Sequence, residues 1–366
     1  MRTAIVYDWI DSWGGAERIL IELNKLFPDA HWYTSTVNLE KATWAAKLNI
    51  TPSFIQKLPS WIRNHRLRAL VLYPFAFESF DFSSYDLVIS VTSGFAKGVI
   101  ARPETKHLCI MLTPMRFLWG EYREKYISNM MKFFLSPYIA YLKKWDTISA
   151  HRPDRYVAIS ETVQKRIKNV YAKSSDVVYP PFDIEYWKSV KPKHVENLPK
   201  EYFLIVSRVE RYKKVDLALE SVQKIGKHLV IVGKGSQIGT LKSISKPAHS
   251  TFLNDISDEK LAYLYSQAQA FIMPQEEDFG YTSLEAQFFG CPVIAFNKGG
   301  ATETIIEGKT GIFFKKQTVE SLTQTLEEYG SIGYNLRGKT KINGPKNAER
   351  FSSDMFRRKF LDIINL

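Results

Sequence analysis

The sequence predicts an α/β protein with two domains, each built on a doubly wound parallel sheet. Short apolar runs rich in β-branched residues alternate with longer amphipathic stretches, which is typical of parallel strands connected by helices. The chain has 366 residues, more than one hydrophobic core usually supports. An apolar content of 45% favours globular cores rather than a disordered chain.

The expected strands form two series, separated by a segment with little periodicity. The first series covers residues 3–8, 85–91, 106–112 and 155–160, and the second covers 202–207, 228–233, 270–274 and 292–296. Proline and lysine are frequent between the two series, so we expect a linker at 182–200. The predicted domains are 1–181 and 201–349. Apolar residues at helical spacing predict a last helix over about 350–366, which we expect to pack back on the first domain.

The charge and the cysteines limit the classes of partner and location. A net charge of +12 suits a polyphosphate ligand, a nucleic acid or an anionic membrane surface. The chain carries no recognisable nucleic-acid-binding motif, so we expect no nucleic acid partner. Cys109 and Cys291 each lie in an apolar run, which favours buried reduced thiols and a cytoplasmic location. Residues 129–145 are interrupted by lysine and proline, so any membrane contact is expected to be peripheral, at the inner face of the cell membrane.

A glycine pair follows the first expected strand. The stretch "DSWGGAERIL" at 11–20 places Gly14 and Gly15 directly before residues with helical spacing. Glycine has no Cβ, so backbone N–H groups there can approach an anion at the positive end of the helix dipole. A turn that needs glycine only for its backbone angles is the alternative. The pattern is not G-x-G-x-x-G, so it does not predict a nicotinamide dinucleotide site.

Basic residues follow the first strand of the second series. In "SRVERYKK", Arg208 precedes Lys213 and Lys214 by five and six residues. A planar guanidinium and a mobile ammonium at the carboxyl edge of a parallel sheet suit the oxygens of a diphosphate. A solvated basic loop is the alternative.

Acids and helix-capping residues follow the strand expected at 270–274, in "EEDFGYTSLE" (276–285). We expect Thr282 and Ser283 to provide the N-cap of the next helix, with the amides from about Gly280 to Leu284 available as donors. Glu277 and Glu285 are separated by this turn and could bind two parts of one elongated ligand. Glu276 and Asp278 could merely favour the helix dipole.

Together these motifs resemble the retaining GT-B glycosyltransferases of family GT4, over nearly the whole chain. The E-x7-E element of that family is matched by Glu277 and Glu285, and "GGAER", "SRVERYKKVDLALES" and "IVGKGS" occur in the family's order. The resemblance is closest to polysaccharide and lipopolysaccharide mannosyltransferases of bacteria and archaea, through "LTPMRFLWGEY", "VVYPPFD", "EEDFG" and "GGATETI". It implies two Rossmann-like domains facing a central crevice, with the acceptor on the N-terminal domain and the nucleotide-sugar on the C-terminal domain.

The resemblance also implies roles for individual residues. Arg208 and Lys213 would hold the donor diphosphate, and Glu277 would lie beside the transferred sugar, so these three are the expected catalytic residues. Glu285 would bind the ribose hydroxyls. Gly15, together with Gly14, would approach the phosphate from the first domain. The amides of Phe279, Gly280 and Tyr281 would bind the transferred sugar. Thr282 and Leu284 are further expected donor-binding residues. The family needs no metal and no resident cofactor, and its nucleotide-sugar is a co-substrate.

The expected function is transfer of a hexose, with GDP-mannose as the favoured donor, onto a lipid-linked glycan or a growing polysaccharide. A UDP-sugar donor, or a non-catalytic partner that binds nucleotide-sugar or glycan in an assembly complex, are the alternatives. Leu112 motivates the second, because it stands where related sequences usually carry a histidine. Basic and aromatic residues interleave at 55–75 and 116–146, which suits contact with an anionic membrane or, alternatively, ordinary amphipathic packing.

Overall fold

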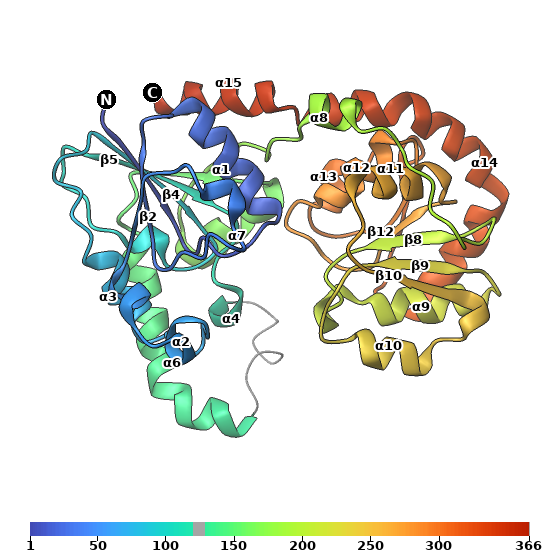
Figure 1. Ribbon diagram of the computed structural model, residues 1–366, viewed down its shortest axis with the longest axis horizontal. Coiled ribbons are helices and arrows are strands. Elements are labelled where there is room, and N and C mark those ends of the chain that lie inside the picture. Colours follow the sequence, from blue (N-terminus) through green and yellow to red (C-terminus); the bar gives the residue numbers. More distant parts are fainter. Residues whose placement is uncertain (120–128, 366) are drawn as a thin grey trace. The chain divides into compact units, whose positions relative to one another are not determined.

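The computed structural model describes residues 1–119 and 129–365, with the side chains of 129–135 left undescribed. The chain separates into two compact units (Figure 1). The first contains Met1–Pro180 and the last residues from Ile363 onward, and the second contains Pro181–Asp362. The segment predicted as a linker, 182–200, includes helix α8 (Ile184–Ser189) and belongs to the second unit. In the first unit, Lys106 Nζ donates to the carbonyl oxygen of Ile364 at 2.8 Å.

The first unit is built on a seven-stranded parallel sheet in the order β3-β2-β1-β4-β5-β6-β7. Its strands are β1 (Thr3–Tyr7), β2 (His31–Thr34), β3 (Ile50–Pro52), β4 (Leu87–Thr92), β5 (Lys106–Met111), β6 (Arg155–Ala158) and β7 (Asp176–Val177). Its α-helices include α1 (Gly15–Leu26), α2 (Ser60–Arg63), α3 (Tyr73–Glu78), α4 (Arg116–Trp119), α6 (Asn129–Ser149) and α7 (Glu161–Tyr171). Strands β1 and β4 are buried along their whole length, as the apolar runs predict.

The second unit has a six-stranded parallel sheet in the order β10-β9-β8-β11-β12-β13. Its strands are β8 (Phe203–Val206), β9 (Leu229–Val232), β10 (Ser250–Leu253), β11 (Phe271–Met273), β12 (Val293–Phe296) and β13 (Gly311–Phe314). Its other α-helices are α9 (Val215–Lys224), α10 (Ile238–Ile244), α11 (Asp258–Gln267), α12 (Tyr281–Phe288), α13 (Ala301–Thr304) and α14 (Val319–Glu349). Helix α15 (Ser353–Ile364) belongs to the second unit except for its last two residues, which belong to the first.

Helices cover both faces of the second sheet, so its strands are buried on both sides. Phe203 and Ile205 pack in the core cluster shared with α9 and α14. Tyr202 and Leu204 pack in a separate cluster shared with α11 and α12. The alternation follows from the two-residue period of a strand. In Figure 1, α9 and α10 accordingly lie on one side of the strands and α11 to α13 on the other.

The strands that the sequence did not predict lie mainly at the sheet edges. Strands β3 and β7 end the first sheet, and β10 and β13 end the second. An edge strand needs no long apolar run because it has a neighbour on only one side. Strand β2 is internal, but its "HWYT" sequence is short and half polar, so periodicity does not reveal it.

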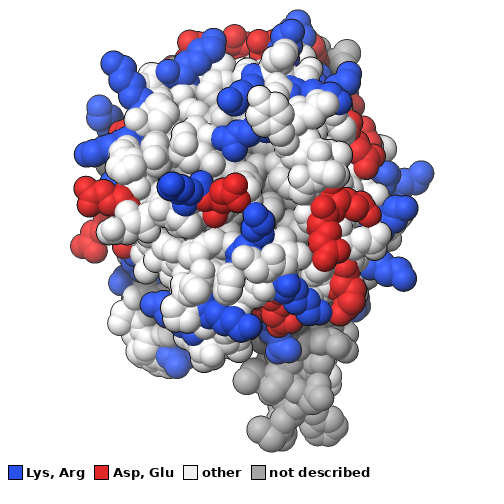
Figure 2. Space-filling view, turned by 90° about the vertical axis from the view of Figure 1, so that its right-hand side faces the viewer, with Lys and Arg blue, Asp and Glu red and all other residues white. Residues whose placement is uncertain are grey.

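Three further properties bear on the expectations from composition. Cys109 and Cys291 are buried and free, and burial raises the pKa of each thiol to about 12. Within the described part of the chain, no helix combines the length and apolar character needed to span a membrane. On the face shown in Figure 2, basic and acidic side chains are interspersed, so the net positive charge is not collected into one patch there.

Candidate active site

The loop after β8 carries the predicted diphosphate residues. It runs from Ser207 through the short helix η4 (Arg211–Lys213) to the start of α9. Two glycines after β9 let the backbones pack closely. A Cβ on Gly233 would lie 1.9 Å from the Ser207 carbonyl oxygen, and one on Gly235 would lie 2.2 Å from that of Val209. The carboxyl ends of β8 and β9 are therefore held together by backbone contacts that only glycine permits.

Arg208 is exposed at this edge of the sheet, whereas Lys213 is largely covered. Arg208 Nη2 donates to the hydroxyl of Tyr212 at 2.7 Å. The ammonium of Lys213 lies 5.2 Å from the centre of the Tyr212 ring. Tyr212 thus contacts both cations of this short loop, the guanidinium through its hydroxyl and the ammonium through its ring.

Lys213 forms an ion pair with Glu277, although 64 residues separate them. The two side chains are only 12% and 20% exposed, so the pair is shielded from solvent. Gln275 Nε2 also donates to the same carboxylate oxygen, at 2.8 Å. The sequence predicts that Lys213 binds a diphosphate and Glu277 a sugar. In the structure, the two side chains contact each other.

The loop that carries Glu277 is clamped by a second glycine pair, Gly299 and Gly300. Gly300 N donates to the Glu277 carbonyl oxygen at 2.8 Å. A Cβ on Gly299 would lie 2.4 Å from that oxygen, and one on Gly300 would lie 2.4 Å from the carbonyl oxygen of Phe279. Gly299 also has a positive φ of +75°, which favours glycine. The "GGATETI" stretch therefore sets the position of the acidic loop.

The start of α12 corrects one prediction. The N-cap is Gly280, with a φ of +96°, and not Thr282 or Ser283. Glycine takes this left-handed conformation without steric cost, so the helix starts earlier than a side-chain cap would place it. Ser283 Oγ instead donates to the Gly280 carbonyl oxygen at 2.7 Å. It also lies 2.9 Å from the hydroxyl of Thr304, which ties α12 to α13.

The predicted sugar-side and ribose-side residues lie along this turn and helix. The ring of Phe279 is buried against Tyr281 and Phe351, and Leu284 is fully buried, so only their backbone could face a ligand. Glu285 is nearly buried one turn inside α12, and the Tyr265 hydroxyl donates to its Oε2 at 3.1 Å.

Some side chains beside the predicted residues were missed. Gln275 orients Glu277, and its position two residues after the end of β11, at the carboxyl edge, is the signal that could have identified it. Lys298 pairs with Glu276 at 3.1 Å, so Glu276 has a structural partner in addition to any effect on the helix dipole. Nothing in the local sequence indicates that contact, because it joins two different loops.

Gly14 and Gly15 belong to the first unit, where Gly14 is the N-cap of α1 and Gly15 its first residue. Both are exposed. The nearest acid is Glu17, whose Oε2 would lie 3.2 Å from a Cβ on Gly14. Burial raises the pKa of Glu17, which also accepts a 3.0 Å hydrogen bond from the Tyr7 hydroxyl. An anion-binding role for the glycine pair stays a prediction.

Two further features of the described residues concern the expected chemistry. Leu112 follows β5 directly and is half-buried, with its amide bonded to the Thr92 carbonyl oxygen at 2.8 Å. In residues 1–119 and 129–365, no group of three or more His, Cys, Asp or Glu side chains is arranged to hold a metal ion.

Comparison with known proteins shows what the second unit is similar to. The family model of "Glycosyl transferases group 1" matches residues 188–347, which are somewhat less than half of the chain. The match covers the loops that carry Arg208, Lys213, Glu277 and Glu285, and it confirms the predicted resemblance.

Curated relatives extend the comparison, at modest identity. Mouse alpha-1,3/1,6-mannosyltransferase ALG2 is 28% identical over 266 residues, which are 63% of this chain and 61% of the mouse protein. A GDP-mannose-dependent alpha-(1-6)-phosphatidylinositol monomannoside mannosyltransferase of Mycobacterium tuberculosis is 33% identical over 125 residues, 30% of this chain and 32% of the relative. The alignments thus span less than two thirds of either relative.

Solved structures match the whole chain in fold. HepE of Anabaena in complex with UDP has a TM-score of 0.69 and 16% identity, and the match covers 100% of both chains. Sucrose-phosphate synthase from Thermosynechococcus elongatus has a TM-score of 0.76 and 16% identity, covering 100% of this chain and 98% of the other. The predicted GT-B fold with two Rossmann-like domains is confirmed.

A double-mutant cycle tests the contact between Lys213 and Glu277. We expect the effects of Lys213→Met and Glu277→Gln on the free energy of unfolding to be coupled by about 1–3 kcal/mol. Each single change leaves the partner's charge without its counter-charge in a site that is shielded from solvent. Urea unfolding of the two single variants and the double variant measures the coupling. The pair of Lys224 and Glu320 is the control, since it is 3.8 Å long and highly exposed, and its coupling should be near zero. Equal coupling in both pairs would contradict the shielded contact.

Proposed function

We propose that the chain is a retaining glycosyltransferase that moves a hexose from a nucleotide diphosphate donor to a glycan acceptor. The observation that carries the proposal is the pairing of Lys213 with Glu277 at the carboxyl edge of the second sheet, beside Arg208. Lys213, the proposed cation for the phosphates, thus directly contacts Glu277, the proposed acid for the sugar. The group 1 match over the same loops supports this activity.

The reaction has two electrostatic demands, and the side chains on these loops suit both. The bond between the anomeric carbon and the diphosphate oxygen breaks, while the acceptor hydroxyl bonds to that carbon on the same face and its proton passes to the departing phosphate. Arg208 and Lys213 stabilise the negative charge of the leaving group. Glu277 stabilises the positive charge at the anomeric carbon and accepts a hydrogen bond from the sugar.

Donor binding exchanges one set of contacts for another. The diphosphate offers Lys213 a new anionic partner, so the ammonium leaves Glu277 and the carboxylate becomes available to the sugar. Gln275 keeps its hydrogen bond to Glu277 and limits the rotation of the carboxylate. Glu285, held by Tyr265, binds the ribose hydroxyls. The backbone turn at Phe279, Gly280 and Tyr281 binds the sugar. The proposal requires no cofactor beyond the nucleotide-sugar.

For the donor we propose GDP-mannose. The support is that the mouse and mycobacterial relatives are named mannosyltransferases, the latter GDP-mannose-dependent. A UDP-sugar is the competing choice.

Replacing one of two adjacent acids tests the catalytic role. Glu277→Gln should lower transfer by about a hundredfold or more, because the neutral amide cannot stabilise positive charge at the anomeric carbon. The matched control is Glu276→Gln, which removes the ion pair with Lys298 and should keep most activity. Turnover of purified protein is measured with radiolabelled donor. Near-normal transfer by Glu277→Gln would refute the role, and the lack of any donor hydrolysis or transfer by the unaltered protein would favour the non-catalytic alternative.

A panel of nucleotide-sugars tests the donor. Thermal denaturation should show that GDP-mannose raises the Tm more than GDP-glucose, UDP-glucose or UDP-N-acetylglucosamine, because a ligand stabilises the fold in proportion to its affinity. Arg208→Gln should reduce the shift for every donor, since the diphosphate is common to all of them. Stabilisation by UDP-sugars but not by GDP-sugars would overturn the choice of GDP-mannose.

We further propose that the acceptor is lipid-linked and that the first unit contacts an anionic membrane peripherally. The support is a segment of exposed apolar side chains interleaved with exposed cations at 54–75. The apolar residues are Phe54, Trp61, Leu67, Val71 and Phe75, and the cations include Lys57, Arg66 and Arg68. The second stretch expected to contact membrane, 116–146, lies partly outside the described residues, at 120–128.

Vesicle binding tests this contact. The protein should co-sediment with vesicles that contain phosphatidylglycerol and much less with pure phosphatidylcholine, and binding should weaken as salt is raised. The double variant Trp61→Ser with Leu67→Ser should bind less, because both exposed side chains could enter the interface. The control is Tyr334→Ser, a highly exposed residue on α14. Equal binding by all three proteins would contradict this surface.

A further inference from the structure

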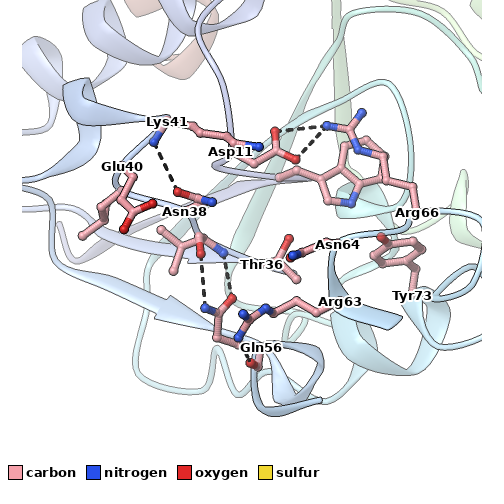
Figure 3. A pocket seen from close by; sticks show the side chains of 13 residues that line it. Asp11, Thr36, Asn38, Glu40, Lys41, Gln56, Arg63, Asn64, Arg66 and Tyr73 are labelled. Atoms are coloured by element: carbon pink, nitrogen blue, oxygen red, sulfur yellow. Dashed lines mark hydrogen bonds and ion pairs between the residues drawn. The ribbon is translucent and has the colours of Figure 1, made fainter. Parts of the chain in front are cut away.

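The first unit contains a pocket of about 440 Å³ that the donor contacts do not use (Figure 3). Its walls come from the loops that follow β1 and β2, from helix η2 (Phe54–Lys57), and from α2 and α3. The residues that matter for the argument are Trp9, Asp11, Gln56, Arg63, Asn64 and Tyr73. The loop with Trp9 and Asp11 continues into Gly14 and Gly15, so the pocket lies beside the start of α1 in the chain.

Hydrogen bonds hold the pocket walls in place. Gln56 bonds to Val37 in both directions, accepting from its N–H at 2.9 Å and donating to its carbonyl at 3.2 Å. Arg63 Nη1 donates to the Gln56 carbonyl oxygen at 3.0 Å. Arg66 Nη2 contacts both carboxylate oxygens of Asp11, at 3.1 and 2.9 Å, and its guanidinium stacks 4.3 Å from the centre of the Trp9 ring. Figure 3 shows these bonds around the cavity.

Two of the lining residues, Trp9 and Tyr73, each have a buried polar atom without a completed hydrogen bond among the described residues: Trp9 Nε1 and the Tyr73 hydroxyl. Tyr73 is only 1% exposed. The two rings meet edge to face, with centres 5.6 Å apart. Burial raises the pKa of the Tyr73 hydroxyl, and the Trp9 N–H acts on it as a nearby donor that lowers that pKa. Figure 3 shows the Tyr73 ring directed toward Asn64 and the other polar side chains. Buried polar atoms are nearly always hydrogen-bonded, so this incompletely bonded pair at a cavity wall is suited to contact a polar ligand.

The charges indicate the kind of ligand. The lining carries two acids, Asp11 and Glu40, and three cations, Lys41, Arg63 and Arg66. Asp11 is neutralised by Arg66, whereas Arg63 has no acidic partner in the described structure. A guanidinium has five N–H groups, and one hydrogen bond to Gln56 leaves most of them for a ligand. Burial raises the pKa of Tyr73, so its hydroxyl stays protonated and can donate. The cations of the lining thus outnumber its acids by one, which favours an anion, and the aromatic walls suit the apolar face of a sugar ring.

We propose that this pocket binds a sugar unit that carries a carboxylate or a phosphate. Arg63 binds the anionic group, and the Trp9 N–H and the Tyr73 hydroxyl bind oxygens of the same sugar. The proposal rests on the proposed function and deepens it, because it assigns the acceptor glycan to a chemical class: the sugar unit that this pocket binds is negatively charged. Phosphate and carboxylate share this chemistry, so the experiment includes both.

Direct binding to the whole protein tests the pocket. Isothermal titration compares mannose, mannose 6-phosphate, glucuronic acid and inorganic phosphate. We expect at least one charged sugar to bind more tightly than mannose, and Arg63→Gln to weaken that binding about tenfold or more, as for the loss of a charge-assisted hydrogen bond. Tyr73→Phe removes only the hydroxyl and should weaken it several-fold. The control is Arg102→Gln, an exposed arginine of the same unit that does not line the pocket, and it should change nothing. The Tm of each variant reports whether it is folded.

Each contrary outcome overturns the proposal. Mannose binding as tightly as the charged sugars would remove the role of the anion, and phosphate binding as tightly as mannose 6-phosphate would remove the role of the sugar. Unchanged affinity in folded Arg63→Gln, or no binding of any probe, would reject the site. Donor hydrolysis is measured separately. If the protein hydrolyses donor but binds none of the probes, this inference alone is refuted. If it binds a charged sugar but does not turn over donor, the proposed function is refuted.

Discussion

Close packing of backbone against backbone at the carboxyl edge of the second sheet is the constraint on which the candidate site depends. Gly233 and Gly235 allow the loop after β9 to touch Ser207 and Val209, and Gly299 and Gly300 do the same for the loop of Glu277 and Phe279. A side chain at these glycines would overlap a carbonyl oxygen. Main-chain contacts thus set the positions of both loops, and Lys213 of one loop contacts Glu277 of the other.

The ion pair has a consequence for how such a site works. The shielded cation and the shielded acid neutralise each other, which avoids leaving either charge uncompensated in a place of low dielectric. Under the proposed function, a diphosphate and a sugar would offer the two groups separate partners, so the free energy of breaking the pair would be offset by contacts made only when both parts of the donor are present. Selectivity for a complete nucleotide-sugar over a nucleotide or a sugar alone would follow from this exchange.

In the first unit a buried carboxylate has the anchoring role that glycines have in the second. Asp8, at the end of β1, accepts hydrogen bonds of 2.8 Å from the backbone N–H groups of Ser93, Phe95 and Ala96. Burial raises the pKa of Asp8, and these bonds oppose the rise. The loop that starts with Trp9 therefore leaves the sheet from a fixed point, and the pocket bounded by Trp9 and Arg63 inherits that position.

The sequence by itself determined what depends on local pattern. The central strands are continuous apolar runs because they are buried on both faces, and the glycine pairs, basic loop and E-x7-E spacing are all visible within short windows. The edge strands were not predicted because exposure weakens the apolar pattern of their sequences. The N-cap at Gly280 was not predicted because a glycine in the left-handed conformation has no side-chain cap that a sequence pattern could show. Only the tertiary structure decided that Lys213 contacts Glu277, that Lys298 contacts Glu276, and that Trp9, Arg63 and Tyr73 line one pocket. The physical reason is that these contacts join loops from different strands, whose approach is set by sheet order and by backbone packing and not by any local periodicity.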